Sequence, residues 1–170
     1  PPVASKPRRP DLAKGVTLDE ALLAICRSIL AHLLEALPAA EDGRDAEGVH
    51  QTRVALRRLR SLLSLMRAAT DAPAMTAFRA EAGRIADALG SARDTDVFIA
   101  ETLRTVETAL PELDGFAALH RIAETRRADH YADVRRVLAD QRTGRFLLEL
   151  GLWIEQRGWR SSTRHDVLDR

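Results

Sequence analysis

The sequence predicts an all-α protein, and three observations lead to this fold class. The bulk of the 170 residues are Ala, Leu, Arg and Glu, which are strong helix formers. Apolar residues recur at helical spacing along most of the chain. No segment shows the alternation of Val, Ile or Thr that is typical of a strand. We expect an up-and-down four-helix bundle unit followed by the start of a second, related helical unit.

The chain divides into two parts. Residues 1–15 contain four prolines and no hydrophobic period, which predicts a Pro-rich linker. Residues 16–170 form the helical domain. A capping box between Thr17 and Glu20 opens its first helix, and Pro38 should end that helix near Leu37.

The later helices are delimited by turn and capping residues. Gly90 should break the third helix, and Ser91 with Asp94 resembles a capping box that would open the fourth. Pro111 should end the fourth helix. We expect helices two to six at about residues 49–69, 74–89, 91–110, 113–141 and 143–157.

Residues 50–67 combine five arginines and one histidine with no carboxylate. At about 100° per residue, one quadrant of this helix holds His50, Arg53, Arg57, Arg60, Ser64 and Arg67. Arg58 points away from that face. A solvated helix usually mixes acids with bases at i,i+4 spacing, whereas this ladder has nothing within the helix to neutralise it. The pattern indicates a binding site for a linear anion, although pairing with Glu81, Asp87 or Asp94 of neighbouring helices would also satisfy the charges.

Charge and composition exclude several classes of protein. The net charge is only +1, and without the five arginines of residues 50–67 the rest of the chain carries −4, so the basic character is local. The single cysteine, Cys26, cannot form an internal disulfide and is expected to be buried, and Trp153 and Trp159 are expected to be packing residues. We find no apolar run of about 20 residues and no secretory signal, and therefore expect a cytoplasmic protein without a membrane partner.

The segment LGSARDTDV, residues 89–97, is the second motif. Asp94 and Asp96 are two residues apart on a helix, so their side chains diverge and do not resemble a chelating pair. With Gly90 and Arg93 they could form a fixed ion-pair corner or part of a metal site, but we interpret them as acids favoured by a helix N-terminus. The sequence therefore indicates no metal site and no cofactor.

The two motifs together resemble the CHAD domain, the conserved histidine α-helical domain. The first matches in the order His50, Arg53, Val54, Arg57, Arg58, Leu59, Arg60 and Ser61. The second matches at Leu89, Gly90, Ala92, Arg93, Asp94, Asp96 and Val97. The resemblance implies two related four-helix units around a basic cavity. Nothing after Gly115 matches the basic helix of the family's second unit, so that unit looks incomplete.

The resemblance also implies a function. CHAD domains bind inorganic polyphosphate without hydrolysing it and often follow a CYTH domain. We therefore expect a non-catalytic module that brings its protein to polyphosphate granules in the cytoplasm. By resemblance, His50, Arg53, Arg57 and Arg60 line the cavity and Arg93 contributes from the next motif. Arg58 belongs to the motif as well, and Arg67 extends the ladder by its position on the helix face.

Three other functions remain open at this stage. A metal-dependent phosphohydrolase would use His50, Asp94 and Asp96, but the sequence lacks a recognisable ligand cluster. A specific nucleic-acid binder would interleave aromatic residues with the arginines, and none interrupts the ladder. A purely structural bundle would pair its arginines internally.

Overall fold

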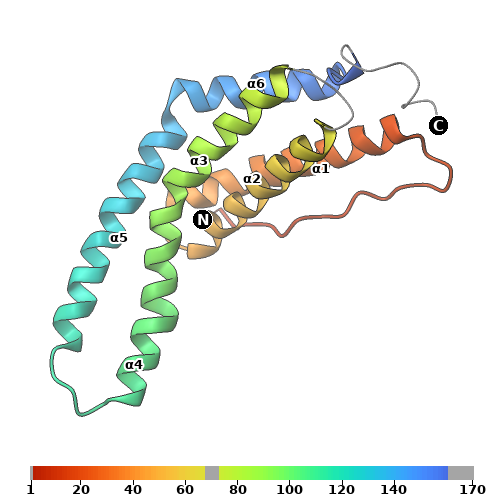
Figure 1. Ribbon diagram of the computed structural model, residues 1–170. Helices are drawn as coiled ribbons and strands as arrows, with labels where there is room; N and C mark the ends of the chain where they lie inside the picture. Colours follow the sequence, from red (N-terminus) through yellow and green to blue (C-terminus); the bar gives the residue numbers. More distant parts are fainter. Residues whose placement is uncertain (1, 68–72, 161–170) are drawn as a thin grey trace.

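The computed structural model describes residues 2–67 and 73–160, and these are helical apart from short connections and the first residues (Figure 1). The elements are α1 (Leu18–Asp42), α2 (Ala46–Met66), α3 (Pro73–Val97), the π-helix η1 (Phe98–Leu103), α4 (Arg104–Ala109), α5 (Phe116–Ala139) and α6 (Gln141–Glu155). Within these two ranges there is no strand. The predicted all-α class is confirmed.

The first helix begins as predicted but does not end at Pro38. Thr17 accepts a hydrogen bond from the Glu20 amide, and Glu20 accepts one from the Thr17 amide, which completes the capping box. The helix continues through Pro38 to Asp42 and is closed by Gly43 with φ +72°. The reason is packing: the buried backbone of Ala39 and Ala40 lies so close to Gly48 that a Cβ there would be 2.3 Å from the Ala39 carbonyl carbon. This contact between α1 and α2 outweighs the hydrogen bond that proline removes.

The predicted break at Gly90 is also wrong. α3 runs without interruption through Gly90, and the chain stays helical through η1 and α4 to Ala109. Ser91 and Asp94 are therefore interior helix positions and not a capping box. An isolated glycine is tolerated inside a helix where close packing requires it, and Gly90 has such a neighbour in Arg53.

The other boundaries differ from the predictions by a few residues. Asp45 caps α2, and its carboxylate accepts a hydrogen bond from the Glu47 amide at 2.8 Å. The predicted end of this helix at Ala69 lies outside the described residues. Asp140 caps α6, which therefore begins two residues earlier than expected.

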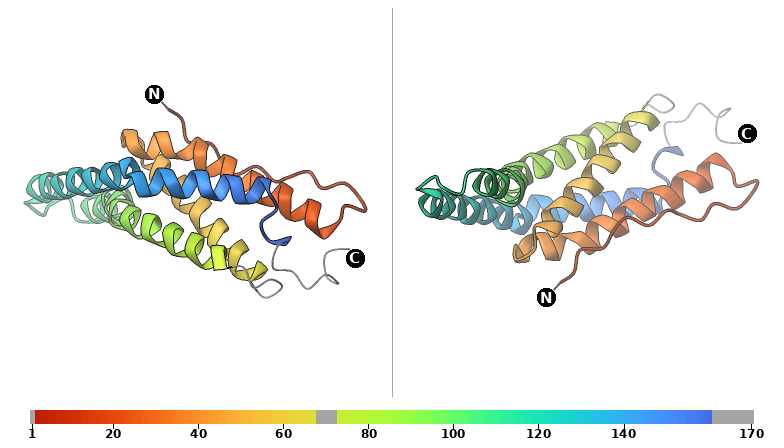
Figure 2. Two further views of the ribbon diagram at one scale, coloured as in Figure 1. Left: turned by 90° about the horizontal axis from the view of Figure 1, so that it is seen from above. Right: turned by 90° about the horizontal axis from the view of Figure 1, so that it is seen from below.

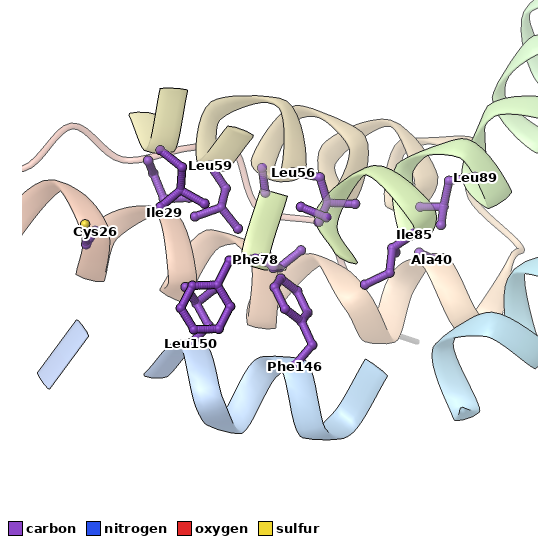
Figure 3. Close-up of a cluster of buried hydrophobic side chains, with 14 of the residues drawn as sticks. Cys26, Ile29, Ala40, Leu56, Leu59, Phe78, Ile85, Leu89, Phe146 and Leu150 are labelled. Carbon is purple, nitrogen blue, oxygen red and sulfur yellow. The ribbon is translucent and has the colours of Figure 1, made fainter. Parts of the chain in front are cut away.

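The hydrophobic core lies where α1, α2, α3 and α6 meet (Figure 3). It includes Ile29, Leu56, Ile85 and Leu150, one from each of these helices. Cys26 is buried as predicted, and burial raises the pKa of its thiol to about 12. α2 packs mainly against α1 and α3, which leaves one of its faces outside the bundle.

Away from this core, α5 lies beside the long helix formed by α3, η1 and α4 (Figures 1 and 2). The two are joined by a buried carboxylate: Asp96 accepts hydrogen bonds from Arg127 Nε and from the Tyr131 hydroxyl, both at 2.7 Å. The chain then bends at Asp140, and α6 continues from the end of α5 across α1 and α3 (Figure 2). Asp96 therefore lies inside α3 and not at the predicted helix N-terminus, and it forms an ion pair with Arg127 of α5.

The end of the described chain is fastened to the beginning of α1. Asp19 is only 3 % exposed and accepts hydrogen bonds from Trp159 Nε1 at 2.8 Å, from Arg160 and from Arg157. Burial raises the pKa of Asp19, but these hydrogen bonds and the two arginine charges outweigh it and hold the pKa below its usual range. Trp159 also packs edge-to-face on Trp153, so both tryptophans are packing residues as predicted.

The predicted linker is in contact with α1. The Ser28 hydroxyl donates to the Arg8 carbonyl oxygen at 2.7 Å, and His32 Nε2 lies 3.1 Å from the carbonyl oxygen of Ser5. His32 Nε2 is also 3.1 Å from Gln51 Oε1 of α2. The first residues thus cover a polar contact between α1 and α2.

α1 alone among the described helices is long and apolar enough to cross a membrane, with a mean hydropathy of 1.5 over its best window. A third of that window is buried inside the protein, where α1 contributes Cys26, Ile29 and Leu33 to the core. The core helix of a soluble protein meets the same criteria. The finding differs from the expectation that no segment would reach this length.

Candidate anion-binding site

A pocket of about 330 Å³ lies between α2 and α3 on the face of α2 that carries the arginine ladder. Its lining residues are His50, Arg53, Val54, Arg57, Arg60, Ala86, Asp87 and Arg93. Five of the seven residues predicted to bind an anion are therefore brought together. Arg93 comes from α3, so the site is assembled from two helices.

Glycines of α3 make room for the arginines of α2. A Cβ on Gly90 would lie 3.3 Å from Arg53 Nη1, and a Cβ on Gly83 would lie 3.9 Å from Arg60 Cζ. Arg53 Nη1 also donates a hydrogen bond to the Ala86 carbonyl oxygen at 2.5 Å. The two helices are antiparallel here. Arg60 follows Arg53 by seven residues on α2, and its neighbour Gly83 precedes Gly90 by seven residues on α3.

The basic side chains of the pocket lack carboxylate partners among the described residues. Within residues 2–67 and 73–160, neither His50 nor Arg57, Arg60 or Arg93 forms a side-chain hydrogen bond or an ion pair. Arg57 and Arg60 are exposed, whereas Arg93 is partly buried. The site therefore presents several guanidinium groups whose donors are free for a ligand.

The carboxylates that could have paired with the ladder are placed elsewhere or stay unpaired. Glu81 binds Arg84 and Arg142 on the side of α3 that faces α6. Burial raises the pKa of Glu81, but the hydrogen bonds from these two arginines lower it by more, so its pKa lies below the usual range. The Glu81 carboxylate is therefore already paired with two arginines outside the ladder. Asp87 lines the pocket, and Asp94 lies by a different cavity beside His130. No ion pair of Asp87 or Asp94 occurs in the part of the chain that the structure describes.

Two predicted binding residues lie outside the pocket. Arg58 is partly buried on another face of α2, where its charge acts on His32 of α1, and its Nη1 is inaccessible and unpartnered among the described residues. Arg67 is the exposed C-cap of α2. The structure thus brings neither residue to the five that line the pocket.

The residues of the hypothetical metal site are separated. His50 lines the pocket between α2 and α3, Asp94 lines the cavity between α3 and α5, and Asp96 is held by Arg127 and Tyr131. Across the described ranges, no group of three His, Cys, Asp or Glu side chains has a metal-binding arrangement. The Asp96 contacts join residues 31 and 35 positions apart, which no local pattern could indicate.

Comparison with known proteins assigns the fold. A family model described as the CHAD domain matches residues 24–170. The chain belongs to the CHAD domain family. The resemblance inferred from the two motifs is confirmed, while an attached CYTH domain stays a prediction.

A solved CHAD domain is similar over nearly all of this chain. The crystal structure of the CHAD domain from the plant Ricinus communis shares 30 % sequence identity with a TM-score of 0.78. The similarity covers 91 % of this chain and 51 % of the plant chain, so this CHAD domain spans about half the length of that structure. A search of the curated proteins gives no match.

Proposed function

We propose that this CHAD domain binds inorganic polyphosphate in the pocket between α2 and α3 and does not hydrolyse it. The observation that carries the proposal is that three arginines, Arg57, Arg60 and Arg93, surround one pocket together with His50 and have no anionic partner among the described residues. A pocket with this composition is incomplete without an anion. Membership of the CHAD family supports polyphosphate as that anion.

The spacing of the ladder suits a linear polymer. Arginines three and four residues apart on α2 follow each other at roughly 5 Å along the helix axis. A polyphosphate chain carries a charge on each phosphate, so one segment of it could contact successive guanidinium groups. The planar guanidinium also presents paired N–H donors that match phosphate oxygens.

The pocket is less suited to nucleic acids. Its lining contains no aromatic side chain on which a base could stack. A ligand that is recognised through its phosphates alone is favoured, and sequence preference for DNA or RNA is not expected. If the domain binds polyphosphate in the cell, it would bring its protein to polyphosphate granules.

The test is isothermal titration with long-chain polyphosphate at two salt concentrations. The triple variant Arg53→Ala/Arg57→Ala/Arg60→Ala should lose at least about a hundredfold in affinity, because each charged contact contributes about 1.5 kcal/mol or more. Binding by the native domain should weaken steeply with salt. A matched control, Arg121→Ala/Arg126→Ala/Arg135→Ala, removes the same charge from exposed positions of α5 and should bind nearly as the native domain does.

Competing ligands and a product assay complete the test. Pyrophosphate and double-stranded DNA should compete poorly with long-chain polyphosphate. Phosphate release in the presence of Mg²⁺ or Mn²⁺ would contradict the non-catalytic proposal and favour a phosphohydrolase. Absence of binding to any polyanion at low salt would favour a purely structural bundle.

A further inference from the structure

Arg79 of α3 is a partly buried arginine without a visible structural role. Its Nε has no accessible surface and no hydrogen-bond partner among the described residues. A buried guanidinium N–H without an acceptor is unfavourable, because it loses water without replacing it. Such a group in a folded protein calls for an explanation.

The position of Arg79 connects it with the anion site. Starting at Arg79, steps of four and three residues along α3 lead to Gly83, Ala86, Gly90 and Arg93. These residues form one face of the helix. Ala86 and Arg93 line the pocket, and Gly90 lies beside Arg53. Arg79 is therefore on the face of α3 that meets the arginine ladder.

The antiparallel register gives Arg79 its neighbour on α2. Because Gly90 meets Arg53 and Gly83 meets Arg60, Arg79 is placed one helical turn farther, opposite Ser64. The Ser64 hydroxyl donates back to the Arg60 carbonyl oxygen at 2.7 Å. Among the described residues, neither helix face has an acidic residue at this end, so Arg79 adds positive charge there.

The opposite end of the pocket, near His50, has a negative charge beside it. One turn before His50 on α2 is Glu47, which accepts a hydrogen bond from Gln51 at 2.6 Å. A polyanion that leaves the pocket is repelled at that end and attracted at the end near Arg79. From His50 to Ser64 the helix rises about 21 Å, which exceeds the span of a short phosphate oligomer.

We propose that Arg79 extends the anion site beyond Arg60 and binds the phosphates of a chain too long for the pocket. This inference rests on the proposed function. It assigns to Arg79 a role in selecting long polyphosphate over short oligomers. Anions that fit within the pocket, such as tripolyphosphate, do not reach it.

The test compares Arg79→Gln with Arg135→Gln, which neutralises an exposed arginine on α5. Arg79→Gln should weaken long-chain polyphosphate binding about tenfold and change tripolyphosphate binding less than twofold. It should also reduce the magnitude of the slope of log affinity against log salt by about one, which is the contribution of one phosphate contact. Arg79→Lys, which keeps the charge, should restore most of that slope, whereas a merely structural role would not respond to charge in this way.

The outcomes separate the two proposals. If the native domain binds long-chain polyphosphate and Arg79→Gln behaves as Arg135→Gln does, the role of Arg79 is refuted and the proposed function stands. An equal loss for tripolyphosphate and long chains would also refute the length selection. If the native domain binds no polyphosphate, the proposed function itself fails.

Discussion

Arg53 Nη1 donates a hydrogen bond to the main-chain carbonyl oxygen of Ala86 at 2.5 Å. A carbonyl oxygen has two lone pairs, so it can accept this bond in addition to its bond within α3. The contact fixes one arginine of the ladder against the neighbouring helix. Its remaining N–H groups are then positioned at the pocket before any ligand arrives, which reduces the entropy cost of binding.

Gly90→Ala is expected to weaken polyphosphate binding without destabilising the domain. A Cβ at Gly90 would be 3.3 Å from Arg53 Nη1, so the arginine must move from its position beside Ala86. Alanine also favours the helix by roughly 0.5–1 kcal/mol. We expect polyphosphate affinity to fall several-fold while the free energy of unfolding, measured by urea denaturation, stays the same or rises.

Gly83→Ala is the matched control for this substitution. Its Cβ would be 3.9 Å from Arg60 Cζ, an ordinary contact that requires no movement. The same gain in stability should therefore occur without loss of affinity. Equal affinities for the two variants would show that the position of Arg53 does not affect binding.

Asp87→Asn is expected to strengthen polyphosphate binding. Asp87 is an exposed carboxylate in a pocket lined by four arginines, and it has no ion pair among the described residues. Its negative charge repels a polyanion, so neutralising it should increase affinity about twofold to fivefold at low salt, and less at high salt. Titration calorimetry at two salt concentrations measures this, and weaker binding by Asp87→Asn would mean that the carboxylate supports the site.

Asp19→Asn is expected to destabilise the domain by about 2 kcal/mol. The buried carboxylate binds Trp159, Arg157 and Arg160, and an amide cannot replace the charge-assisted bonds. The loss stays below that of a fully buried ion pair because the arginines keep contact with water. Glu155→Gln breaks an exposed pair with Arg27 and should change stability far less, because solvent screens the two charges. Chemical denaturation that ranks these two variants equally would contradict the assignment.

Protonation of His32 is expected to destabilise the domain. Burial lowers the pKa of His32 below its ordinary value of 6.5, more than its hydrogen bonds to Gln51 and Ser5 raise it, and the charge of Arg58 lowers it further. The unfolded chain therefore binds the proton first, so stability is complete above about pH 6.5 and declines as the pH falls below it. Nδ1, which would carry the second proton, is buried without a partner among the described residues.

The measurement is the melting temperature between about pH 7.5 and pH 5, above the range in which most carboxylates titrate. The native domain should lose stability over this interval. His32→Gln lacks the titrating group and should show a flatter profile, whatever its absolute stability. Parallel profiles for the two proteins would contradict a buried neutral histidine.

Much of the site could be predicted from the sequence because helical periodicity is a local property. The spacing of His50, Arg53, Arg57 and Arg60 defines one face of a helix whatever surrounds it, and the pocket contains all four. Arg93 was recognised only through the resemblance to the CHAD family. The sequence indicated Asp87 only as an ion-pair partner for the ladder and Gly90 only as a helix break, although Gly83, Ala86, Gly90 and Arg93 share one helical face.

The errors arose where a long-range contact outweighs a local preference. Pro38 and Gly90 usually end helices, but both lie inside one, since Ala39 packs on Gly48 and Arg53 lies against Gly90. None of these contacts is visible in a window of neighbouring residues. Arg58, in contrast, lies outside the pocket as the helical period predicts, and only the match to the family motif had placed it in the site.

The bonds between Asp19 and the last described residues also bear on the order of folding. Asp19 and Arg160 are 141 positions apart, so their contact closes one of the largest loops available to the chain. Such a contact forms after α1, α2 and α3 have packed, because the entropy cost of closing the loop falls once those helices are in place. A substitution at Asp19 should then change the rate of unfolding much more than the rate of folding, so that this carboxylate contributes mainly to the lifetime of the native state.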